Sequence, residues 1–248
     1  IVKWFFVPVI IFGRYVLFCL IPFLIYYVWK RRAQWYRKIQ QHFPAPSDYR
    51  REILHSAITS LIFGVVTWLC LGTPLRQYTQ FYTEVSEYGW GWLALSIPLT
   101  LLIHDAYFYW THRLMHHRAL FPIFHRVHHL STNPSPWAAY SFAPAEAVVE
   151  AGIFPVVAVL MPIHPAAFGL VMLWQIVFNV LGHTGFEFHP RWLMNTPLRF
   201  FLNTPTNHVQ HHEKMRGNYG LYFNVWDRLM GTNHADYERR FHEVTHRS

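Results

Sequence analysis

Long apolar runs separated by polar stretches dominate the chain and predict helices that cross a membrane. Residues 1–29 are almost entirely apolar, interrupted only by Lys3 and Arg14, and residues 53–72 form a second run. About 20 apolar residues are enough for a helix to span a bilayer. We therefore predict two membrane helices here, with Arg14 either reaching the interface or paired inside the membrane.

Three more apolar segments follow a polar loop. Residues 92–103 continue without a helix breaker into HDAYFYWTHRLMHH, which predicts a helix whose histidines lie where it leaves the membrane. Residues 147–163 contain Glu150 and Pro155 and are expected to be kinked or re-entrant. Residues 165–182 are uncharged, whereas residues 183–248 are polar and contain no spanning run.

These patterns predict an all-α fold, a bundle of about four membrane helices with a helical cap on one membrane face. Basic residues at 30–32, 37–38 and 50–51 lie between the first two runs, and positively charged loops favour the cytoplasmic side. We expect the histidine-rich cap on that side of a bacterial inner membrane or an endoplasmic reticulum membrane. A single domain is expected over residues 1–248, with mostly membrane helices in 1–104 and the histidine-rich region in 105–232.

The amino-acid composition indicates a membrane protein whose polar chemistry depends on histidine. Only 14% of the residues are charged, against about 25% in soluble domains. The 18 histidines outnumber the 13 acidic residues, and imidazole is the commonest metal ligand. The net charge of +8 suits a membrane face or an acidic protein, whereas the apolar content argues against nucleic acid. Cys19 and Cys70 lie in apolar runs and are expected to be packing residues.

Histidine clusters with a shared spacing predict metal binding. Residues three and four apart lie on one helix face, so each cluster can direct two or three imidazoles to a common point, which isolated interfacial histidines would not do. The clusters are HRLMH (His112, His116), HRVHH (His125, His128, His129) and HVQHH (His208, His211, His212).

The first cluster shares its helix stripe with Asp105 and Tyr109, whereas His104 and His117 lie off it. We expect Asp105 to orient a ligand imidazole by accepting its other ring N–H. Eight imidazoles exceed the four ligands of one tetrahedral zinc, and none of the eight belongs to an HExxH or Glu-x-x-His motif. The residues thus predict two metal ions but do not choose among zinc, copper, iron and nickel.

Residues 105–232 resemble the fatty acid hydroxylase and sterol desaturase superfamily of integral-membrane, non-haem di-iron oxygenases. The resemblance lies in DAYFYWTHRLMHH, FHRVHHLS, HTG at 183–185, NTPTNHVQHH and NYGLYFNVWDRLMGT at 218–232. It implies that the eight cluster histidines and His183 are metal ligands, with His189 a weaker candidate. Supporting roles are expected for Asp105, Tyr109 and Glu146, for Glu187 in balancing charge, and for Asn218, Tyr219, Trp226 and Asp227 of the last motif. Two departures are FAPAE, with Ala143 where many relatives have histidine, and Met230 in place of an aromatic residue.

The resemblance implies a catalytic region in 105–232 that holds two Fe ions (Fe2+/Fe3+), with O2 as co-substrate. Hydroxylation of a C–H bond in a lipid from the bilayer, a fatty acyl chain or a sterol, is the expected reaction. Desaturation or alkyl-ether cleavage on the same site remain open. The chain has no GxGxxG or haem-attachment motif, so the electrons are expected from a separate ferredoxin, cytochrome or reductase. The alternatives from other classes are a zinc-dependent membrane hydrolase and a non-catalytic haem or electron-carrier protein.

Overall fold

Helices connected by loops make up the described part of the chain. The computed structural model describes residues 2–247, with side chains from Trp4 onward, and within this range no β-strand forms. Ile1 and Ser248, the ends of the predicted domain, lie outside the described residues. The predicted all-α class is confirmed.

Four long helices are apolar enough to cross a membrane, as predicted. They are α1 (Val2–Phe23), which continues as a π-helix over Leu24–Trp29, α2 (Pro46–Gly72), α3 (Gly89–Met115) and α8 (Pro165–Gly182). The shorter helices are α4 (Phe121–Phe124), α5 (Arg126–His129), α6 (Pro144–Ala151), α7 (Ile153–Leu160), α9 (Pro205–Lys214), α10 (Val225–Leu229) and α11 (Tyr237–Thr245). Single 3₁₀ turns occupy Trp35–Arg37, Pro74–Tyr78, Val85–Glu87, Pro136–Tyr140, Arg191–Asn195 and Pro197–Phe200.

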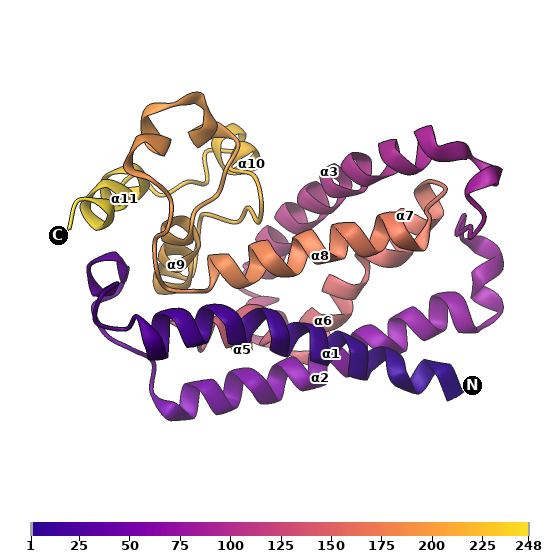
Figure 1. The fold of residues 1–248 in the computed structure, drawn as a ribbon, viewed down its shortest axis with the longest axis horizontal. Helices are drawn as coiled ribbons and strands as arrows, with labels where there is room; N and C mark the ends of the chain where they lie inside the picture. The colour runs from indigo at the N-terminus through magenta and orange to yellow at the C-terminus, as the bar shows by residue number, and fades with distance from the viewer. Residues whose placement is uncertain (1, 248) are drawn as a thin grey trace.

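The long helices form a bundle with the cap at one end. In Figure 1, α1 runs beside α2 and α8, and α8 in turn packs against α3. Helices α9, α10 and α11 gather at the end of the bundle that carries the C-terminus, and the N-terminus lies at the opposite end (Figure 1). This arrangement places the cap against the ends of α3 and α8.

Small residues and a buried loop hold the bundle together. A Cβ atom at Gly64 would lie 2.4 Å from Pro8 Cγ, so glycine allows α1 and α2 to approach closely. The 3₁₀ turn Pro136–Tyr140 is buried among α1, α2 and α8. Tyr15 anchors it from α1 by donating a hydrogen bond to the carbonyl of Trp137 at 2.7 Å. The cap's connecting loop therefore forms part of the bundle core.

Two segments differ from the prediction in their bounds. Helix α2 begins at residue 46 rather than 53 because Pro46 starts the helix and Asp48 accepts a hydrogen bond from the Ala45 N–H at 2.9 Å. The apolar run 147–163 is bent, as expected, but the break is at Gly152, between α6 and α7. Pro155 lies in the first turn of α7, where its missing N–H costs no helical hydrogen bond.

Candidate metal centre

Nine histidine side chains converge where α3, α5, α8 and α9 meet, and they form two adjacent groups. The five-histidine group holds His112, His116, His125, His129 and His211, and the four-histidine group holds His128, His183, His208 and His212. Within each group the candidate ligand nitrogens all lie within 4.8 Å of one another. These are the nine residues named from the sequence, and His189 is in neither group. Their role as metal ligands stays a prediction.

The sequence clusters do not correspond to the two groups. HRVHH gives His125 and His129 to the five-histidine group and His128 to the four-histidine group. HVQHH gives His208 and His212 to the four-histidine group and His211 to the five-histidine group. Histidines four apart stay together because they lie on one helix face, whereas the adjacent histidine points elsewhere. Each cluster therefore brings two imidazoles to a common point, and in two of the three clusters the third histidine joins the other group. The groups are neighbours, with the rings of His129 and His212 4.9 Å apart.

Backbone carbonyls accept hydrogen bonds from the Nδ1 atoms of five of these histidines, on the side of each ring away from the centre of its group. Because a carbonyl can only accept, each of these Nδ1 atoms carries the hydrogen, and the Nε2 atom of the neutral ring keeps its lone pair. The contacts are His112 to Tyr219 at 2.8 Å, His116 to Met215 at 3.0 Å, His128 to Ser141 at 3.3 Å, His183 to Asn179 at 2.7 Å and His211 to Gly217 at 2.6 Å.

The Nε2 lone pairs point at one another. His116 and His211 have their Nε2 atoms 3.2 Å apart in the five-histidine group, and His128 and His183 have theirs 3.3 Å apart in the four-histidine group. Neither pair has a hydrogen to share, so the close approach is repulsive without a cation between the rings. The donor set therefore fits one metal ion in each group.

Burial keeps these rings neutral and available as ligands. Burial, together with the nearby His112 ring, lowers the pKa of His129 to about 3. Burial likewise lowers the pKa of His183 to about 4. Neutral imidazole is the form that binds metals.

The chain after α9 is shaped to present its carbonyls to the rings. Met215 adopts a left-handed conformation with φ 55° and Gly217 one with φ 66°, so the helix ends sharply and their carbonyls face His116 and His211. The next residues are held by Asp227, whose carboxylate accepts from the Tyr219 N–H at 2.8 Å and the Gly220 N–H at 2.7 Å. Asp227 thereby fixes the position of the Tyr219 carbonyl, which accepts the hydrogen bond from Nδ1 of His112.

Glu146 is an acidic side chain that contacts a grouped histidine. Its Oε1 lies 2.6 Å from Nδ1 of His125, and both side chains are buried. This is the arrangement in which a carboxylate fixes the orientation of a metal-binding imidazole. Its placement agrees with the supporting role expected for Glu146, which stays a prediction.

Asp105 and Tyr109 support the last motif instead of the histidines. The prediction that Asp105 accepts an imidazole N–H was wrong, because its Oδ1 accepts from the backbone N–H groups of Tyr222 at 3.2 Å and Phe223 at 3.3 Å. The Tyr109 hydroxyl lies 3.0 Å from Oγ1 of Thr232, and its ring stacks on Trp226 at 5.8 Å. A helical wheel gives the direction of a side chain but not the identity of the loop that packs there.

Glu187 and His189 also support the backbone near the centre. Glu187 accepts from both the N–H and the hydroxyl of Thr206 in the first turn of α9, at 3.0 and 2.6 Å. Its other oxygen lies 2.8 Å from Nδ1 of His189. Asn218 donates to the carbonyl of Asn207 at 2.9 Å.

The sequence did not predict the backbone carbonyls of Ser141 and Asn179 as hydrogen-bond acceptors for the histidines, because no side-chain type in the sequence marks a backbone acceptor.

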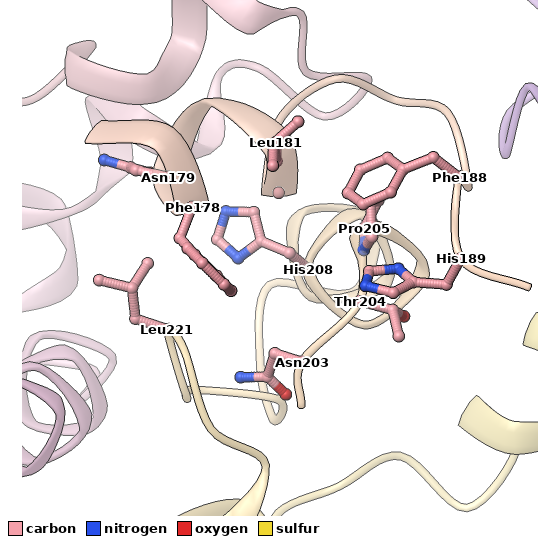
Figure 2. Close-up of a pocket in the computed structure, with 11 residues that line it drawn as sticks. Phe178, Asn179, Leu181, Phe188, His189, Asn203, Thr204, Pro205, His208 and Leu221 are labelled. Carbon is pink, nitrogen blue, oxygen red and sulfur yellow. The ribbon is translucent and has the colours of Figure 1, made fainter. Parts of the chain in front are cut away.

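A small cavity of about 70 Å³ touches the four-histidine group. Figure 2 shows the His208 ring near the middle of its lining, with Phe178, Leu181, Phe188 and Leu221 around it. Phe178 and Leu181 belong to the last turns of α8. The cavity thus connects the end of a membrane helix to a histidine of the centre.

Together, the fold and the site define an integral membrane protein with a buried histidine centre suited to two metal ions. Comparison with known proteins agrees: the profile described as fatty acid hydroxylase matches residues 97–232, which is more than half of the chain. The chain belongs to this family, within the fatty acid hydroxylase and sterol desaturase superfamily.

Several curated proteins are similar to this chain. Over 210 residues it is 30% identical to the Delta(7)-sterol 5(6)-desaturase ERG3B of Gibberella zeae, covering 85% of this chain and 62% of that protein. It is 28% identical over 234 residues to erg3C of Aspergillus fumigatus, a protein of the same description, covering 85% and 69%. It is 29% identical over 183 residues to the lathosterol oxidase of Mus musculus, covering 69% and 59%. The chain therefore spans less than two thirds of ERG3B and of the mouse protein. No solved structure gives a significant match.

Proposed function

We propose that the protein is a membrane-bound di-iron oxygenase that uses O2 and external electrons to hydroxylate a C–H bond of a lipid, a fatty acyl chain or a sterol. The observation that carries the proposal is the pair of neighbouring histidine groups with opposed Nε2 lone pairs. Catalysis is assigned to residues 105–232 of a single domain over 1–248, and residues 1–104 serve mostly as membrane helices.

The residues supply neutral ligands, fixed orientation and exclusion of water. When bound, two iron ions would supply the one-electron chemistry that converts O2 into an oxidant able to cleave a C–H bond. The carbonyl contacts and Glu146 hold the imidazoles in position, and eight of the nine rings are buried, which keeps solvent from the centre. The apolar cavity beside His208 gives hydrocarbon a place next to the centre.

Desaturation is a second candidate because the relatives named above are sterol desaturases and a lathosterol oxidase. Hydroxylation and desaturation both begin with loss of a hydrogen from carbon, so one centre could serve either. The distinction lies in whether oxygen enters the product. Alkyl-ether cleavage on the same centre would release an aldehyde.

The electron donor is proposed to be a separate ferredoxin, cytochrome or reductase that docks on the cytoplasmic face. The loop between α1 and α2 carries exposed Lys30, Arg31 and Arg32, and such a surface suits an acidic protein. The same basic loop supports a cytoplasmic position for the cap in a bacterial inner membrane or an endoplasmic reticulum membrane.

The test begins with the metal content of detergent-purified wild type and of His128→Ala, followed by anaerobic iron reconstitution. We expect about two irons per chain in the wild type and a loss in the variant. The reconstituted protein is then given heavy-isotope O2, a reduced ferredoxin, and either a Delta(7)-sterol or phosphatidylcholine in nanodiscs, with mass spectrometry of the lipid.

Heavy oxygen in the lipid supports hydroxylation, and loss of two hydrogens without oxygen supports desaturation. No stoichiometric metal after reconstitution overturns the proposal. Lipid hydrolysis without O2 or reductant, together with bound zinc, would instead identify a membrane hydrolase. A Soret band in the isolated protein would identify a haem protein.

A further inference from the structure

Residues 131–141 form a loop between α5 and α6 that contacts His128 at both of its ends. The Ser131 N–H donates to the His128 carbonyl at 3.2 Å, and the Ser141 carbonyl accepts from Nδ1 of His128 at 3.3 Å. Every residue from Asn133 to Ser141 is buried. The position of the 131–141 loop therefore determines where both the backbone and the ring of His128 lie.

The same loop is linked to a second member of the four-histidine group through Asn179 in α8. The Asn179 side-chain amide donates to the carbonyl of Ala139 at 2.7 Å, and its backbone carbonyl accepts from Nδ1 of His183 at 2.7 Å. The Nε2 atoms of His128 and His183 are 3.3 Å apart. A shift of the loop would therefore change how these two candidate ligand nitrogens face each other.

Glu52 in membrane helix α2 holds the first part of the loop at two points. Its side chain is fully buried, and its two carboxyl oxygens lie 2.8 Å from the hydroxyl of Ser131 and 2.5 Å from that of Ser135. A carboxylate accepts from both hydroxyls, whereas a protonated carboxyl group accepts from one and donates to the other. The two contacts therefore hold in either protonation state of Glu52.

Other side chains of α1 and α2 hold the middle of the loop. Ser56, one turn after Glu52, donates to the carbonyl of Trp137 at 3.3 Å, which also accepts from the hydroxyl of Tyr15. Arg14 donates to the hydroxyl of Tyr140 at 3.5 Å. The first two membrane helices thus contact the loop along most of its length.

We propose that Glu52 is a positioning residue for the four-histidine group and acts through the 131–141 loop on His128 and His183. The inference rests on the proposed function, because it assigns Glu52 to the same metal centre, and it gives α2 a role beyond that of a membrane helix. The five-histidine group should depend less on Glu52, because the carbonyls that accept from His112, His116 and His211 lie after α9.

The first experiment measures metal affinity in each group. The full chain in phosphatidylcholine nanodiscs is titrated with Co2+, which binds imidazole, in competition with a chelator. We expect two Co2+ sites in the wild type, and His212→Ala identifies the absorption of the four-histidine site. Glu52→Ala should weaken that site by roughly 10- to 100-fold, as loss of an outer contact does, and leave the other site unchanged. Equal weakening of both sites, or of neither, overturns the proposal.

Three further variants separate positioning from general stability. Glu52→Gln keeps polar atoms for both serines and should retain most of the affinity. Ser60→Ala is the matched control, because the buried Ser60 hydroxyl contacts only the Ser56 carbonyl within α2, and both sites should be unchanged. Ser135→Ala removes one of the two contacts and decides the question if Glu52→Ala does not fold. Selective weakening of the four-histidine site then supports the proposal, and full affinity overturns it.

A second, metal-free measurement separates this proposal from the proposed function. Solid-state NMR of protein with isotopically labelled histidine reports the Nδ1–H of His128, assigned by its absence in His128→Gln. We expect Glu52→Ala to shift or remove this signal and to leave that of His112, whose acceptor is the Tyr219 carbonyl. An unchanged His128 signal overturns the role of Glu52. Absence of Co2+ binding in the wild type would count against the proposed function, and the NMR result would then decide the role of Glu52 alone.

Discussion

The two histidine groups lie side by side but are built differently. The four-histidine group is wholly buried, and its outer contacts go to backbone carbonyls at the end of α8 and in the loop before α6. The five-histidine group includes half-buried His116, a carboxylate contact to His125, and carbonyls from the loop after α9. The four-histidine group therefore takes its outer contacts from α8 and a buried loop, and the five-histidine group takes its outer contacts from cap loops and an acidic side chain. Substitutions should affect the two metal ions unequally.

The largest difference is expected from removing one ligand in each group. His183→Ala leaves three imidazoles in its group, one fewer than a tetrahedral metal needs, whereas His116→Ala leaves four. We expect His183→Ala to lose about one metal per chain and His116→Ala to lose much less, as measured by elemental analysis after purification. His246→Ala is the control, because it removes an exposed histidine outside both groups. Equal loss in the His183 and His116 variants would show that the groups bind metal as one unit.

Asp227→Ala tests the dependence of the five-histidine group on the loop. It leaves the buried N–H groups of Tyr219 and Gly220 without their acceptor, at about 1–3 kcal/mol each. We expect a clearly lower thermal unfolding midpoint and preferential loss of one metal per chain. Glu243→Ala, at an exposed ion pair with Arg239, should change the stability by less than about 1 kcal/mol. Full metal content in Asp227→Ala would contradict the proposed role of the loop.

A smaller effect is expected at Glu146, which contacts a single ring. Glu146→Ala removes the partner of His125, and loss of such an outer contact weakens metal binding by roughly 10- to 100-fold. Glu146→Gln keeps an oxygen acceptor and should lose less. Metal affinity is measured by competition with a chelator on reconstituted protein. If both variants have the same metal affinity as the wild type, the contact has no role in positioning His125.

The sequence predicted the membrane helices well because apolar run length is a direct physical requirement of the bilayer. It also identified the nine histidines that converge, since their spacing on helices is regular. It did not predict how adjacent histidines such as His128 and His129 divide between groups, because that depends on the relative placement of α3, α5, α8 and α9.

Contacts to the backbone and contacts between distant segments also could not be predicted from the sequence. Asp105 was placed on the correct stripe of α3, but its partner is the backbone of a loop more than a hundred residues away, at Tyr222 and Phe223. The start of α2 was predicted too late because the polar turn that begins with Pro46 carries no apolar signal. Arg14 was recognised as a charge that needs a partner, whereas its partner Tyr140 lies in a loop that the sequence does not assign to the bundle.

The distribution of ligands over the chain has a consequence for how the protein is made. Both groups take histidines from α9, and the other histidines lie in or directly beside α3 and α5 or directly after α8. Neither group is complete until α9 has left the ribosome and the preceding helices have been inserted. Under the proposed function, metal loading would be a late step in biogenesis, and a chain truncated before residue 208 would be a membrane protein without a complete centre.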